Sequence, residues 1–174
     1  MATYTLGPED GVISVRTSRV GAVAKAGHDL VIHVTEWSAM LDTGDAPSLS
    51  LDADATSLRV REGSGGIKPL GEDDLAKIEQ TIDDQVLRRR DIAFRATSLR
   101  VDGDRLAVTG DLTLVGTTRP IAFELSLAGG RVTGAAVLRQ TDWGIKPYTA
   151  LFGALKVADE VRVEIDCGLP RPAP

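Results

Sequence analysis

The sequence is dominated by an alternation of apolar and polar residues with a period of two. In the segment 48–58, Leu49, Leu51 and Ala53 alternate with serine and aspartate residues. Successive side chains of an extended strand point to opposite faces, so this pattern predicts a strand with one buried side and one side facing water. The same alternation recurs at 91–101, 105–116, 119–130 and 160–168.

Short turn segments separate these strands. Asp102-Gly103-Asp104, Gly116-Thr117-Thr118 and Gly129-Gly130 each lie at hairpin distance between two alternating runs. Such short connections imply antiparallel neighbours. With the opening segment, the stretch from Leu30 and the run from Arg131, we count roughly eight or nine strands. An all-β, antiparallel sheet of this size closes into a barrel or splits into a sandwich.

One segment departs from this period. Leu75, Ile78, Ile82 and Val86 recur at spacings of three and four, which predicts one short amphipathic helix over about 72–89. Acidic residues at its start and arginines at its end suit the helix dipole. We expect this helix to cover an open end or a flank of the sheet.

Length and charge exclude several classes of function. At 174 residues the chain fits a single domain, which we place at 1–169, with a loose tail at 170–174. The net charge of −5 and the aromatic content of 4% argue against nucleic-acid binding and against a general attraction to anionic membranes. The single cysteine, Cys167, excludes an internal disulfide and a thiolate zinc site.

The amino terminus has neither a basic segment followed by an apolar run nor a membrane-spanning stretch. The sequence therefore predicts a cytoplasmic protein without a transmembrane segment.

Both histidines lie in the stretch AGHDLVIHV, where His28 precedes Asp29 and His33 follows in a strand. A spacing of five with no third histidine is poor for a metal site, so we expect no metal. On an extended chain His28 and Asp29 point apart, and no Gly-x-Ser-x-Gly elbow supplies a nucleophile. We interpret His28 as a loop residue at the rim of the barrel, and we expect no catalytic residue and no cofactor.

Four other features are interpreted structurally. The glycine-rich stretch 61–71 contains Lys68 but lacks the ending of a phosphate loop, so a flexible connection is favoured. The arginines at 88–90 are typical of a solvated helix end. Trp143 is either a core plug or a pocket wall near a rim. Small inward residues such as Ala53, Gly110 and Ala136 leave either a tight corner or a hollow.

Five motifs resemble the YceI-like family, and they occur along the chain in the order that is typical of that family. GDLTLVGTTRPIAFEL at 110–125 resembles its strand, Gly-x-Thr turn and proline-led strand. The opening YTLGPEDGVISVRTS, the strand DIAFRATSLRV and the closing VADEVRVEIDCGL are also similar to the family's. RQTDWGI resembles its Arg-x-Asp-Phe-Gly-Ile stretch, with Trp143 where phenylalanine is usual.

The resemblance implies an antiparallel, eight-stranded, lipocalin-like barrel that binds, stores or transports a polyisoprenoid or similar long amphiphile without enzymatic activity. The inward apolar residues would line the tunnel: Leu51, Phe94, Leu106, Val108, Leu112, Leu114, Phe123, Leu125, Trp143, Val163 and Ile165. His28, Lys68 and Lys146 are expected at its polar mouth. Two alternatives stay open, a small hydrolase-like enzyme using His28 and Asp29 and a ligand-free interaction domain, as does the pairing of two barrels into a homodimer.

Overall fold

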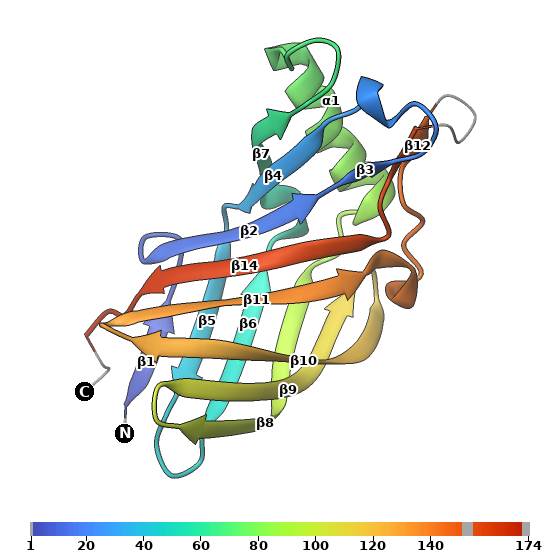
Figure 1. Ribbon diagram of the computed structural model, residues 1–174. Coiled ribbons are helices and arrows are strands. Elements are labelled where there is room, and N and C mark those ends of the chain that lie inside the picture. Colours follow the sequence, from blue (N-terminus) through green and yellow to red (C-terminus); the bar gives the residue numbers. More distant parts are fainter. Residues whose placement is uncertain (1, 151–154, 172–174) are drawn as a thin grey trace.

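Most of the chain forms a strongly curled antiparallel sheet (Figure 1). The computed structural model describes residues 2–150 and 155–171. Neighbouring strands follow the order β1 (Thr3–Leu6), β5 (Trp37–Asp42), β6 (Ser48–Ala53), β8 (Ile92–Asp102), β9 (Arg105–Leu114), β10 (Thr117–Ala128), β11 (Arg131–Arg139), β14 (Glu160–Gly168), β2 (Gly11–Thr17), β4 (Asp29–Val34) and β7 (Leu58–Ser64). The all-β prediction is confirmed, but this sheet has eleven strands where eight were predicted.

Bends in three ribbons account for the difference in strand number. β1 and β2 are separated by a turn at residues 7–10, β4 and β5 by residues 35–36, and β6 and β7 by residues 54–57. The two strands of each pair therefore form one long, bent ribbon. Because β1 and β7, at the two ends of the strand order, continue β2 and β6, the sheet returns on itself as eight ribbons.

Ser57 holds the bend in two of these ribbons. Its carbonyl oxygen accepts hydrogen bonds from the backbone N–H of Thr35 at 2.9 Å and from the Thr35 hydroxyl at 2.7 Å. Its own hydroxyl accepts from the backbone N–H of Glu36 at 3.1 Å. The Asp54 carboxylate meanwhile accepts from the N–H of Thr56 at 2.8 Å, which starts the short 3₁₀ turn η2 (Ala55–Ser57). These local bonds replace ladder bonds where the strands change direction.

Two of the predicted hairpin turns have the backbone that a tight connection requires. Gly129 and Gly130, between β10 and β11, have φ angles of 60° and 72°. Between β9 and β10 the turn lies at Val115 and Gly116, with φ angles of 50° and 74°. It is shifted from the predicted Gly116-Thr117-Thr118, because Thr117 and Thr118 already pair with Leu114 and Thr113. Two central residues with positive φ give the turn whose twist matches the flanking strands.

The helix is shorter than predicted. α1 spans Glu72–Thr81 and passes into a wider π turn, η3 (Ile82–Val86), rather than continuing to residue 89. Arg88 and Arg89 adopt left-handed φ angles of 53° and 55°, and the N–H of Arg89 donates to the carbonyl oxygen of Asp83. The Glu79 carboxylate accepts from the N–H of Val60 at 3.1 Å, which ties α1 to β7 at one end of the barrel. Among the described residues, no helix is long and apolar enough to cross a bilayer.

A second, small sheet lies at the same end of the barrel as α1. It has the order β12 (Thr149–Ala150), β13 (Leu155–Val157) and β3 (Arg19–Val20). A 3₁₀ turn, η1 (Ala24–Ala26), follows β3. Figure 1 shows β3, β12 and α1 at the end opposite to the chain termini. Of the predicted loose tail, residues 172–174 lie outside the described part of the chain.

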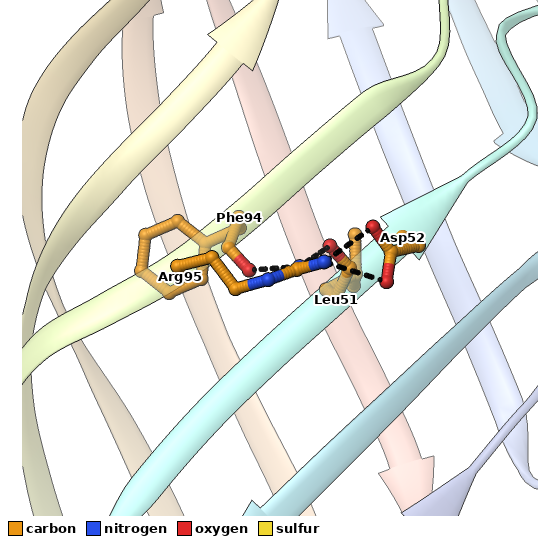
Figure 2. A network of polar contacts seen from close by, with 4 residues as sticks. All are labelled: Leu51, Asp52, Phe94 and Arg95. Carbon is orange, nitrogen blue, oxygen red and sulfur yellow. Dashed lines mark hydrogen bonds and ion pairs between the residues drawn. The ribbon is translucent and has the colours of Figure 1, made fainter.

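Outward-facing polar residues connect β6 to β8. The Arg95 guanidinium donates to both carboxylate oxygens of Asp52, at 2.9 and 3.0 Å, and to the carbonyl oxygens of Leu51 and Phe94 (Figure 2). Because the Arg95 and Asp52 side chains are 55% and 59% exposed, this ion pair adds at most about 1 kcal/mol. Its geometry shows which face of the strand is solvated, and therefore that Leu51 and Phe94 point inward.

Two buried tryptophans provide a matched test of one interior hydrogen bond. The Trp143 indole N–H donates to the carbonyl oxygen of Leu112 at 2.9 Å, whereas the Trp37 indole N–H is buried with no partner among the described residues. Both side chains are more than nine-tenths buried. Trp143→Phe should therefore lower the free energy of unfolding by about 1 kcal/mol more than Trp37→Phe does. Urea unfolding of the two variants measures this difference, and equal losses would show that the Trp143 hydrogen bond contributes nothing.

Candidate functional site

The inside of the barrel contains a cavity of about 730 Å³. Its wall consists of the inward residues of the ribbons, which alternate along each strand as the sequence predicts. β6 contributes Leu49, Leu51 and Ala53, while β14 contributes Val161, Val163, Ile165 and Cys167. A volume of this size lies within the range of 300–1,000 Å³ that is typical of sites for small molecules and cofactors.

The structure places nine of the eleven predicted tunnel residues on this wall. These are Leu51, Phe94, Leu112, Leu114, Phe123, Leu125, Trp143, Val163 and Ile165. Leu106 and Val108 share the inward face of β9, but they are 0% and 1% exposed and do not border the cavity. They pack where β9 leaves the hairpin at Gly103, so side chains fill that part of the barrel.

One small inward residue, Gly110, lies where two strands approach each other too closely for a larger side chain. A Cβ on Gly110 would lie 2.5 Å from the Phe94 ring and 2.8 Å from the Cα of Ala96. Gly110 thus marks a tight corner that leaves room for the Phe94 ring. Phe94 in turn packs against Phe123 with ring centroids 5.5 Å apart, and both rings border the cavity.

Apolar side chains close the end of the cavity near the chain termini. Leu6, Leu41, Val132 and Cys167 line it there, each less than one-tenth exposed. Burial raises the pKa of the Cys167 thiol, as do the nearby carboxylates of Asp10 and Asp166 to a smaller degree. Cys167 is therefore a protonated, apolar wall residue at neutral pH and not an activated nucleophile.

The polar lining residues all lie at the opposite end, beside α1 and the small sheet. They are Thr17, Arg19, His28, Asp74, Lys77, Thr81, Gln140, Tyr148 and Lys156. Tyr148 is 47% exposed, and Lys77 and Lys156 are also exposed, so the cavity reaches the surface here. The interior is consequently an apolar pocket with a single polar mouth among the described residues.

Hydrogen bonds fix part of this mouth. The ring Nε2 of His28 donates to the carbonyl oxygen of Lys68 at 2.7 Å. Asp29 accepts from the backbone N–H of Arg19 at 2.9 Å, and the Arg19 guanidinium donates to the carbonyl oxygen of Gly27. On the neighbouring turn, the hydroxyl and N–H of Thr141 hold the pKa of Asp159 below its usual value.

Of the three predicted mouth residues, His28 borders the cavity, whereas the side chains of Lys68 and Lys146 are exposed beside it. His28 and Asp29 bind different backbone groups, as their opposite directions on an extended chain suggested. His33 lies away from the cavity wall, where burial and Arg61 lower its pKa. Among the described residues, no three His, Cys, Asp or Glu side chains are placed to hold a metal ion.

Sequence reasoning missed the mouth residues that separate segments bring together. Lys77 and Asp74 come from α1, Lys156 from β13 and Gln140 from the 3₁₀ turn η4 (Gln140–Trp143), which directly follows β11. The spacing of Asp74, Ile78 and Thr81 places them on one helix face, which was a usable signal. No comparable pattern marks Gln140 or Lys156, because tertiary contacts alone place them at the mouth.

The contact between His28 and Lys68 can be tested separately from the barrel. His28→Ala should increase amide hydrogen exchange in residues 64–70 by about three- to tenfold, because the loop loses the bond that ties it to the mouth. Lys68→Ala is the matched control, since the bond uses the backbone carbonyl and survives the loss of the side chain. Hydrogen-exchange mass spectrometry measures both variants, and identical exchange in both would contradict the assigned role of His28.

Comparison with known proteins identifies relatives of this chain. A family model described as YceI-like domain matches residues 4–169. Protein YceI of Escherichia coli O157:H7 and that of Shigella flexneri are each 53% identical over 36 residues, which is 21% of this chain and 19% of the relative. The matched segment thus spans about a fifth of the length of these curated relatives.

Solved structures share the fold at low sequence identity. Burkholderia cenocepacia BcnA has a TM-score of 0.63 and 16% identity over 90% of this chain and 94% of its own. The Campylobacter jejuni YCEI protein has a TM-score of 0.60 and 12% identity over 80% of this chain and 84% of its own. These structures support the barrel, and the family model covers nearly the whole chain. The chain belongs to the YceI-like domain family.

Proposed function

We propose that this protein is a non-enzymatic carrier or store for a long apolar amphiphile of the polyisoprenoid type. The observation that carries the proposal is the apolar cavity of about 730 Å³ with its polar residues gathered at one mouth. A chain of isoprene units suits the long apolar wall, and a polar head group suits the mouth. The resemblance to the YceI-like family favours the same class of ligand.

The hydrophobic effect is large enough to account for binding without specific anchors. Burying one methylene-sized group stabilises a complex by about 0.8 kcal/mol. A five-carbon isoprene unit then contributes roughly 3 to 4 kcal/mol as an upper bound. Several units together exceed an association cost of roughly 4 to 15 kcal/mol. Affinity is therefore expected to rise with chain length until the closed end near Leu41 and Cys167 is reached.

The distribution of polar groups supports a carrier rather than an enzyme. Deep in the cavity, Cys167 is protonated and the Trp143 N–H is occupied by the carbonyl oxygen of Leu112. At the mouth, His28 and Asp29 are engaged with backbone groups. A catalytic pair needs two groups within reach of each other and of the substrate. The cytoplasmic localisation and the homodimer stay predictions.

A cavity-filling variant tests the proposal with a matched control on the same strand. Ala136 borders the cavity, whereas its neighbour Ala135 lies on the opposite face of β11. Ala136→Phe should weaken binding of geranylgeraniol by about tenfold or more, because the added ring occupies ligand volume. Ala135→Phe should change the affinity by less than about twofold.

The two tryptophans report binding directly, because both line the cavity. Their fluorescence is followed while geranylgeraniol is added to the wild type and to the two variants. In parallel, native mass spectrometry of protein purified from its own cells should detect a co-purified lipid. An unchanged fluorescence signal, or equal affinities of the Ala136 and Ala135 variants, would show that the cavity is not the binding site.

A further inference from the structure

Positive charge is concentrated at the mouth although the whole chain is acidic. We define the basic rim as residues 18–28, 64–70, 144–150 and 155–157. These segments contain Arg19, Lys25, Lys68, Lys146 and Lys156 and no aspartate or glutamate. They hold four of the five lysines of a chain whose net charge is −5. The molecule therefore has a locally cationic surface although its net charge is negative.

Direct contacts join the segments of the basic rim. Lys156 of β13 pairs with Val20 of β3 in the small sheet. The N–H of Val157 donates to the carbonyl oxygen of Tyr148 at 3.0 Å. The bond from His28 to the carbonyl oxygen of Lys68 attaches the remaining segment. The rim is therefore one continuous surface around the cavity mouth, on the α1 and β3 side of Figure 1.

The rim lysines are free of ion pairs within the described residues. All ion pairs found there use arginine, and most lie along the barrel wall, as between Arg95 and Asp52. In the rim, only Arg19 has a carboxylate partner, Asp29. Lys25, Lys68, Lys146 and Lys156 are exposed. Lysine side chains of this kind place their ammonium groups among phosphates while their stems rest on apolar surface.

Exposed apolar side chains stand among these lysines. Val20, Val23, Ile67 and Tyr148 are 42%, 37%, 79% and 47% exposed, and they make up half of the large exposed hydrophobic residues in the described chain. Ile67 is the most exposed of them and lies next to Lys68. Apolar residues interleaved with lysines are the pattern of a surface that rests in the head-group layer of a bilayer.

Acidic residues border this surface. Asp29 follows the segment 18–28 and pairs with Arg19, Asp159 lies two residues after the segment 155–157 and accepts from Thr141, and three more stand at the start of α1. Glu72, Asp73 and Asp74 form the first turn of α1, directly after the rim segment 64–70. They suit the positive end of that helix, and Asp74 accepts from the N–H of Gly71 at 3.0 Å. A negatively charged surface would repel this turn, so contact is expected on the side of η1, β3 and β13.

We propose that the basic rim docks on the surface of an anionic lipid bilayer. Lysines attract the negative surface potential, and Ile67, Val20, Val23 and Tyr148 enter the head-group layer. The cavity mouth then faces the membrane, so a lipid can move between bilayer and cavity without crossing water. Docking is independent of the cavity, whereas this transfer role rests on the proposed carrier function.

Vesicle co-sedimentation tests the docking. The wild-type protein is mixed with vesicles of 30 mol% phosphatidylglycerol in phosphatidylcholine, or of phosphatidylcholine alone, at low and high salt. We expect binding to the anionic vesicles to be at least about tenfold stronger and to fall as salt rises, because the charges are exposed. Equal binding to both vesicles, or none to the anionic ones, would overturn the proposal.

Matched variants locate the contact. The single variants Lys146→Glu and Ile67→Asp should each reduce binding to anionic vesicles by about tenfold. Arg100→Glu and Met40→Asp, on exposed positions of β8 and β5 remote from the rim, should leave it within about twofold. Circular dichroism checks that all four variants fold. Equal losses in the rim and control variants would show that the rim is not the contact surface.

The vesicle and fluorescence results, together with one further measurement, separate the alternatives. If the wild type binds anionic vesicles but geranylgeraniol gives no fluorescence change, docking stands and the carrier function fails. If it binds geranylgeraniol but no vesicle, the carrier function stands and docking is overturned. Sedimentation velocity tests for another occupant of the rim. If the protein does not bind vesicles but self-associates, and Ile67→Asp abolishes the self-association, the rim contacts a second copy of the chain. This result overturns membrane docking.

Discussion

Backbone hydrogen bonding between antiparallel neighbours holds the sheet in a ring, and the other features of the molecule depend on that ring. A ring forces one face of every strand inward. The apolar residues of the period-two alternation therefore form the inner wall, and the polar residues face water on the outside. The wall encloses space because some inward positions are small, as at Ala53 and Ala136. Aromatic residues are few, and the pair Phe94 and Phe123 occupies only part of the interior.

The two ends of the ring differ in chemistry. At the end near the chain termini, Leu6, Leu41 and Cys167 close the interior, and backbone bonds such as that from Leu169 N–H to the carbonyl oxygen of Gly130 join neighbouring hairpins. At the other end, the helix and the small sheet are separate attachments that bring charged groups to the mouth. The proposed amphiphile would lie with its chain toward Cys167 and its head group near Lys156.

Local sequence predicted most of the wall and little of the mouth. Strands β8 to β11 and β14 follow from alternation and glycine turns, because both signals act within a few residues. The bends at Ser57 and at residues 35–36 were missed, since they depend on hydrogen bonds between two ribbons. The helix ends early for a similar reason: Ile82 of η3 and Leu87 directly after it pack into the interior, and the chain then turns back through Arg88 and Arg89. Lys156 reaches the mouth through its pairing with Val20, which no local pattern encodes.

The proposed carrier function requires an oily molecule to occupy the apolar hollow inside the ring. A crystal structure of the protein purified from its own cells, without delipidation, tests it most directly. We expect continuous, chain-like electron density that runs between Phe94 and Trp143 and ends at the mouth near His28. An interior filled by collapsed side chains, or by ordered water bound to polar groups, would contradict it.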